Sequence, residues 1–120
     1  NLKGVCMKFT VCSLLIIGSL SLTQTVIADC NFPNMNINFP NGSKASEQEM
    51  IETQKKVKAA QSGLITYREC LDKELSSISQ ELENYPEIER ISIDRYNSSV
   101  EAEQELATSW SESVKAFKSK

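Results

Sequence analysis

A seven-residue apolar repeat that leads up to a single proline limits this chain to a small set of folds. Such a repeat places one apolar stripe along an α-helix, and a helix with one stripe buries it against another element. Pro86 ends the pattern, because the residue before a proline avoids helical backbone angles. Ser46 and Glu49 form a capping box at its start. We therefore expect a first helix over about residues 46–84. Its stripe comprises Met50, Val57, Leu64, Leu71 and Ile78, and extends to Tyr85.

A second stripe follows Pro86, which suits the first turn of a helix. We expect this helix over about residues 87–118, with Lys115 and Lys118 at the negative end of its dipole. Glu103 interrupts the stripe; we favour a solvated carboxylate there, and the alternatives are a facing Lys or Arg or a role in register. The predicted packing residues are Tyr96, Val100, Trp110, Val114 and Phe117, and the stripe also includes Ile93 and Ala107.

The turn between the two helices is short, so the helices must run antiparallel. The predicted fold class is all-α: a helical hairpin of coiled-coil type with an extended N-terminal arm. Positions equally far from Pro86 then face each other. Trp110 is expected near Ala60 and Leu64, where Ala60 and Gly63 leave room for the indole.

Residues 29–45 form the predicted arm, in which the tetrad Asn-Phe-Pro-Asn occurs at 31–34 and again at 38–41. Pro33 and Pro40 oppose helix formation and favour an extended backbone. Phe32, Ile37 and Phe39 are too apolar for a free tail, so we expect the arm to cover the hairpin as a third layer. The alternative is a homodimer in which two hairpins form a four-helix bundle.

Cys30 and Cys70 predict one disulfide. The 16 residue steps from Cys30 to Ser46 reach roughly 53 Å when extended, and Cys70 lies about 36 Å along the first helix. The arm can therefore fold back and reach it. A two-thiolate zinc site lacks further ligands, because the chain contains no histidine. We expect no metal and no other cofactor.

The first 28 residues predict a secretory signal peptide, with Lys3 and Lys8 before an uncharged apolar run. An uncleaved anchor is the alternative, but polar residues dilute the second half of the run. Cleavage after Ala28 removes two lysines and no acidic residue, leaving 11 basic against 16 acidic residues and a net charge of about −5. Such a body disfavours nucleic acid and, after cleavage, an anionic membrane surface. A periplasmic or secreted location follows.

Catalytic chemistry has little support in the sequence. Without histidine there is no imidazole base. The carboxylate pairs Glu101/Glu105 and Glu83/Glu87 have helical spacing, but they lie among polar residues and are typical of a solvated face. Tyr67, Tyr96 and Trp110 could line a ligand groove, although their heptad positions favour a core. We expect no enzymatic activity and no catalytic residue.

Short motifs run through the region after residue 28: Cys30, Pro33, Pro40, Gly42, Glu49-Met50, Tyr67-Arg68-Glu69-Cys70-Leu71 and Val114-Lys115-Ala116-Phe117-Lys118. In these motifs the region resembles a group of small secreted proteobacterial proteins of uncharacterised function. Ser109-Trp110-Ser111 departs from the aromatic-Asn pair common in that group. The resemblance implies export and a helical hairpin, with no activity to transfer.

The sequence thus predicts an exported, non-enzymatic helical protein with an interaction or structural role and an unknown protein partner. The alternative is a periplasmic, chaperone-like bundle that holds a small ligand or an apolar client between its helices. The two differ in accessible apolar surface, because a binder exposes a groove that a packed module lacks.

Overall fold

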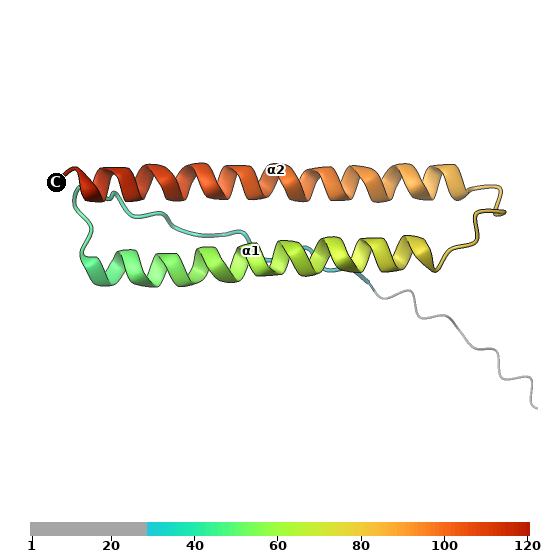
Figure 1. Ribbon diagram of the computed structural model, residues 1–120, viewed down its shortest axis with the longest axis horizontal. Coiled ribbons are helices and arrows are strands. Elements are labelled where there is room, and N and C mark those ends of the chain that lie inside the picture. Colours follow the sequence, from blue (N-terminus) through green and yellow to red (C-terminus); the bar gives the residue numbers. More distant parts are fainter. Residues whose placement is uncertain (1–28) are drawn as a thin grey trace, which may run out of the picture.

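The computed structural model describes residues 29–120, so the predicted signal peptide lies outside the described residues. Two helices make up the fold, α1 (Glu47–Ser76) and α2 (Tyr85–Lys118). They run antiparallel, and the arm returns along them from the second half of α1 to its N-terminus (Figure 1). No strand is present between residues 29 and 120. The predicted all-α hairpin with a tied-back arm is confirmed.

The start of α1 follows from its capping box. The Ser46 hydroxyl accepts a hydrogen bond from the Glu49 amide at 3.2 Å, and the Glu49 carboxylate accepts one from the Ser46 amide at 2.7 Å. Each residue thereby satisfies an amide that the first helical turn leaves without a partner.

The end of α1 comes eight residues before the predicted one, so the expected helix to residue 84 is wrong. The hydroxyls of Ser76 and Ser77 donate to the carbonyls of Asp72 and Glu74, at 2.6 and 2.7 Å. Serine side chains compete in this way with the helical backbone pattern. Residues 77–84 form a succession of turns, and Ile78 lies beyond the helix instead of on its stripe.

The buried side of α1 carries Met50, Val57, Leu64 and Leu71 at seven-residue intervals, and Leu64 has no exposed surface. These side chains form the α1 part of the core, together with Ala60 and Tyr67. Ile78, after the helix, is half-buried.

The buried side of α2 has the predicted seven-residue period with a different phase. Ser99, Leu106 and Ser113 are the buried residues, each one position before the expected stripe. One position corresponds to about 100° around a helix. Tyr96 is 39% exposed, so its assignment to the packing seam is wrong. Ile93, which is 51% exposed, and Ala107 also lie on the exposed side. The remaining predicted residues of this stripe are half-buried: Val100, Trp110, Val114 and Phe117.

The phase of the buried side of α2 differs from the expected one because two small polar residues, Ser99 and Ser113, are buried there. The Ser113 hydroxyl donates to the Pro40 carbonyl of the arm at 3.0 Å, and the Ser99 hydroxyl donates to the Tyr96 carbonyl at 2.6 Å. Both hydroxyls thus have partners, which removes the cost of burying them. Their small size leaves space that a larger apolar residue would fill.

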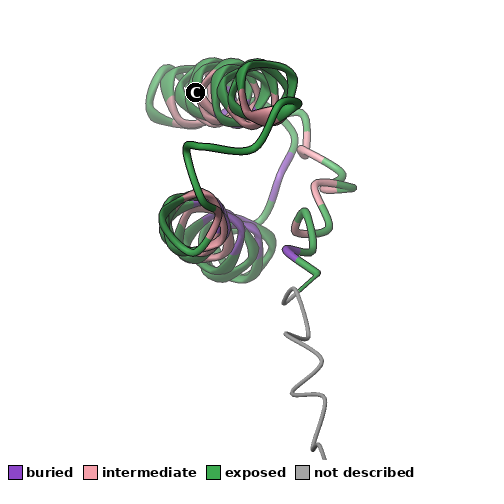
Figure 2. Cartoon of the chain, turned by 90° about the vertical axis from the view of Figure 1, so that its right-hand side faces the viewer, coloured by how far each residue is buried: buried purple, intermediate pink, exposed green. Residues whose placement is uncertain are grey.

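The arm occupies this space as a third layer, and Figure 2 shows it along one side of the helix pair. Its side chains alternate: Met35, Ile37 and Phe39 are half-buried, whereas the intervening asparagines are exposed. The three apolar side chains pack against a cluster formed by Val57, Ala60 and Leu106.

Trp110 packs against this same cluster, but the space beside Gly63 does not hold the indole. Pro33 of the arm fills it, so closely that a Cβ on Gly63 would lie 2.7 Å from the Pro33 Cβ. Gly42 makes a still closer approach to α2. A Cβ there would lie 1.9 Å from the Ser113 carbonyl oxygen, so only glycine fits without a backbone shift.

The Cys30–Cys70 disulfide is present and joins residues 40 positions apart, with the two Cα atoms separated by 5.7 Å. It pins the start of the arm to the second half of α1. The rings of Phe32 and Tyr67 then form a T-shaped contact, with 5.1 Å between ring centroids. Across residues 29–120, neither helix has an apolar stretch sufficient to cross a membrane.

Candidate functional site

The Arg95 guanidinium lies at the boundary between two halves of the hairpin. Arg95 of α2 donates to the Tyr67 hydroxyl, to the Glu74 carboxylate and to the Cys30 carbonyl, each at 3.1 Å. It therefore joins α2, α1 and the arm at the level of the disulfide. The hydrogen bond with Tyr67 raises the pKa of Arg95 above its ordinary value, so the cross-link stays charged.

A second cross-link lies on the arm-covered side of Arg95. Arg68 of α1 pairs with Glu103 of α2 at 2.8 Å and lies 3.4 Å from the Ser99 hydroxyl. Of the hypotheses for Glu103, the pairing with a facing arginine is therefore the one observed. Both residues are partly buried, with the Arg68 side chain 15% and the Glu103 side chain 33% exposed. Pairs of this kind favour one relative register of two helices.

On the other side of Arg95, toward the turn, the arm is absent and a groove remains between the helices. We name it the turn-end groove. It has a volume of about 270 Å³. Its lining is mostly apolar and comprises Glu74, Leu75, Ile78, Ile88, Ile91, Ser92 and Arg95.

The local sequence explains how these residues meet. Leu75 belongs to the last turn of α1, and Ile78 follows in the connection. Ile88 and Ile91 lie three residues apart on one face of α2. Ile91 is 45% exposed, although its side chain is among the most apolar in proteins. An exposed apolar surface around a groove is typical of a contact site.

Negative charge is concentrated at the same end of the molecule. Residues 72–95 contain seven acidic and three basic residues, a net charge of −4. The rest of the described chain contains nine acidic and eight basic residues, a net charge of −1. The turn-end groove therefore lies in the acidic part of the protein.

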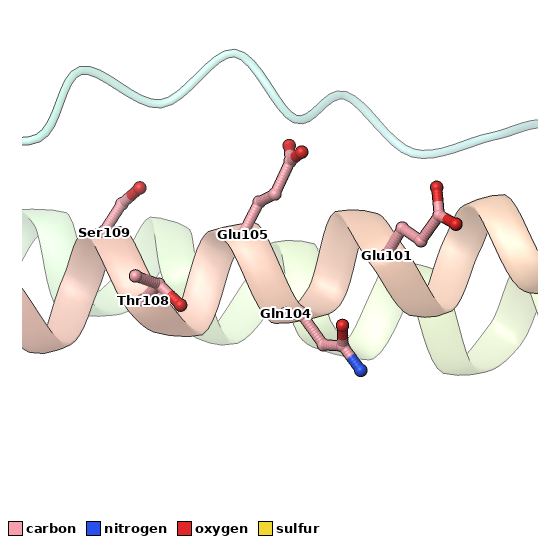
Figure 3. Close-up of a pocket in the computed structure, with 5 residues that line it drawn as sticks. All are labelled: Glu101, Gln104, Glu105, Thr108 and Ser109. Atoms are coloured by element: carbon pink, nitrogen blue, oxygen red, sulfur yellow. The ribbon is translucent and has the colours of Figure 1, made fainter.

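A second depression lies on α2 and is polar. Glu101, Gln104, Glu105, Thr108 and Ser109 line it. Figure 3 shows the Glu101 and Glu105 side chains on the side of α2 where the arm passes, with Gln104 directed away. Both carboxylates are exposed to water. Exposed carboxylates of this kind are typical of a solvated helix face.

Metal-ligating chemistry has no candidate between residues 29 and 120, where no group of three or more His, Cys, Asp or Glu residues could hold an ion. The two cysteines in this range form the disulfide. Among the described residues, the turn-end groove is a mostly apolar surface feature on which a functional hypothesis can be based.

Of the predicted packing residues, only Ile78 lines the turn-end groove. Sequence reasoning missed Ile88 and Ile91, because the second stripe was expected to begin at Ile93. The positions of Cys30 and Cys70 in the sequence could have indicated where the groove lies. Once Cys30 is tied to Cys70, the arm runs toward the N-terminus of α1, and the hairpin beyond Cys70 has no segment of the arm to cover it.

Comparison of the chain with protein-family models finds no match, and comparisons with curated protein sequences and with solved structures find none either. The resemblance to small secreted proteobacterial proteins stays a prediction. The two halves of the hairpin differ in their surfaces, and the mostly apolar groove described above lies at the turn end.

Proposed function

We propose that the protein is an exported, non-enzymatic interaction module whose turn-end groove contacts a partner protein. The observation that carries this proposal is the groove itself. Apolar side chains of both helices are covered by the arm on one side of Arg95 and line an open groove on the other. Leaving such side chains exposed forgoes the stabilisation that burial gives, about 25 cal/mol per Å². A contact with a partner accounts for their presence.

Export is supported by the disulfide between Cys30 and Cys70. Structural disulfides persist in oxidising compartments such as the periplasm and the extracellular space, and they are rare in the reducing cytosol. The leader-like residues 1–28 point to the same compartments.

The rival function is a bundle that holds a small ligand or an apolar client. The size of the groove argues against a small ligand. Pockets for drug-sized molecules occupy roughly 300–1,000 Å³ and enclose most of the ligand. The turn-end groove, at about 270 Å³, falls below that range and opens at the surface beside the exposed Ile91. A protein surface is the better match.

Site-specific photo-crosslinking in the native host tests this proposal. A crosslinking amino acid is placed at position Ile91 in the groove and, as a control, at the similarly exposed Ile65 of α1. We expect one discrete crosslinked product from position 91, several-fold above that from position 65, and its loss when Ile88→Asp is added. Equal yields from both positions, or no product from position 91, would contradict a groove-mediated contact.

A further inference from the structure

The arm shows what kind of segment the space beside these two helices accepts. It is extended, and Met35, Ile37 and Phe39 face the helices while Asn34, Asn36 and Asn38 face water. Its own backbone makes few contacts with the helices, among them the bonds from Arg95 to Cys30 and from Ser113 to Pro40. Alternate apolar side chains therefore hold an extended chain in this position.

The turn-end groove adjoins the start of the arm. Arg95 and Glu74 line the groove, and Arg95 also binds the carbonyl of Cys30. The apolar surface of the two helices continues past this point, whereas the disulfide holds Cys30 beside Cys70. A second extended segment could thus lie on the same helices, beyond the point where the arm stops.

The charge around the groove selects among such segments. Asp72, Glu81, Glu83 and Glu89 are exposed at this end. Of the three basic residues in this range, Arg90 pairs with Glu87 at 2.7 Å and with Asp94 at 2.8 Å, and Arg95 pairs with Glu74. Lys73 is exposed. The net charge of −4 over residues 72–95 therefore faces any approaching molecule. Positive charge on the partner would lower the electrostatic energy of the contact.

The same charge argues against other occupants. A second copy of this chain would bring two acidic ends together, and like charges at an interface are costly. Anionic lipids and nucleic acids are repelled for the same reason. The charge therefore favours a partner protein with basic residues as the occupant of the turn-end groove.

We propose that the turn-end groove binds an extended segment of a partner protein in which apolar side chains alternate with lysine or arginine. This rests on the proposed function of the groove as a protein contact. From Ile88 to Arg95 the groove runs about 10 Å along α2. An extended chain advances about 3.3 Å per residue, so two apolar side chains separated by one basic residue match its length.

Three synthetic peptides test the proposal, all built on arm residues 34–40, Asn-Met-Asn-Ile-Asn-Phe-Pro. One keeps the asparagines, one replaces each with lysine and one with glutamate, and both ends are blocked. Their binding to the naturally processed protein is followed by NMR shifts of its backbone amides. We expect the shifts to map to residues 75–95, and the lysine peptide to bind at least about tenfold more tightly than the glutamate peptide at low salt. Salt should reduce this ratio.

Two variants locate the contact. Ile91→Ser should weaken binding of the lysine peptide several-fold, and Ile65→Ser should leave it unchanged, since both side chains are about half exposed and neither substitution opens the core. Equal affinity for the lysine and glutamate peptides would overturn the proposal, as would shifts that map outside the groove. Self-association at micromolar concentration that shifts the same amides would assign the groove to a second copy instead.

The outcomes separate this inference from the proposed function. If position 91 crosslinks to a partner in the host but the lysine and glutamate peptides bind alike, the groove is a protein contact without a preference for basic segments. If position 91 gives no crosslink and no peptide binds, both proposals are wrong.

Discussion

In the half of the hairpin that the arm covers, Leu64 has no exposed surface, whereas in the turn-end half Ile91 is 45% exposed. The same two helices form both halves, and each half contains an apolar stripe. What differs is the third element, which is present on one side of Arg95 and absent on the other. A pair of helices has one shared contact line, so it buries a stripe fully only where something else covers the remaining side. The arm therefore decides where this protein has a core.

The largest expected effect comes from releasing the arm. Replacing both cysteines, Cys30→Ser with Cys70→Ser, should lower the free energy of unfolding by about 4 kcal/mol in the chain-entropy model for a loop of this length. The covered half should then resemble the turn end and take up a hydrophobic dye. Urea unfolding and dye fluorescence measure the two effects. An unchanged unfolding midpoint would show that the arm is held without the disulfide.

A matched pair of leucines compares the halves directly. Leu64→Ala removes a fully buried side chain and should cost about 3–5 kcal/mol, enough to unfold a domain of this size. Leu82→Ala, at a side chain that is 48% exposed near the turn, should cost less than about 1 kcal/mol. Thermal melts followed by circular dichroism give both values. Similar costs would mean that the two halves are equally packed.

Gly63 tests the contact between arm and helix with a smaller effect. Alanine is favoured over glycine inside a helix by about 1 kcal/mol. In the oxidised protein the new methyl group would press on Pro33, 2.7 Å away, and this overpacking should cancel or exceed the gain. In the protein without the disulfide the arm can move, so Gly63→Ala should be stabilising.

The control for this comparison is the neighbouring, exposed Ser62. Ser62→Ala should change stability by the same few tenths of a kcal/mol with or without the disulfide. A double-mutant cycle from urea unfolding gives the coupling between residue 63 and the disulfide, expected at about 1–2 kcal/mol. A coupling near zero would place Pro33 away from Gly63 in solution.

The smallest effect concerns pH at the beginning of α1. Hydrogen bonds from Ser46, first from its amide, lower the pKa of Glu49 below the usual carboxyl value of 4.5. The capping box therefore contributes stability that is fully present above about pH 4.5 and is lost as the pH falls through the lower, native pKa. Glu49→Gln should melt slightly earlier than the parent at neutral pH. The difference should shrink toward zero in acid.

Arg90 does the same at the turn end, where it lowers the pKa of Glu87. Glu87→Gln should therefore show the same direction of pH dependence. Thermal midpoints of both variants and the parent, taken from neutral pH to about pH 3, check the sign. A difference that grows in acid would mean that the charged carboxylates do not stabilise the fold.

Much of the fold could be predicted because its strongest signals are local or depend on simple reach. The capping box of Ser46 and Glu49 located the start of α1, and Pro86 placed the beginning of α2 within two residues. The disulfide followed from the two cysteines of residues 29–120 and from the length of the arm. None of these inferences required knowing which segment packs against a given face of a helix.

The features that were missed depend on tertiary contact. Ser99 and Ser113 are buried on α2 because the arm and α1 come close there, whereas a search for apolar periodicity assigns that side to Tyr96 and Val100. The early end of α1 comes from serine hydroxyls that bond its last carbonyls. The turn-end groove begins where the arm stops covering the helices, so its position depends on where the arm's alternate side chains lie.

The position of the disulfide along the chain has a consequence for assembly. Both cysteines precede α2, and a chain emerges from the ribosome or a translocation pore with its N-terminus first. Once residues up to Ser76 have emerged, the arm can be cross-linked to α1 while α2 is still unavailable. Gly42 can meet Ser113 only afterwards. The second helix would then dock onto an arm and first helix that are already joined by the disulfide. Oxidation of the cysteines would in that case affect the order of folding as well as the final stability.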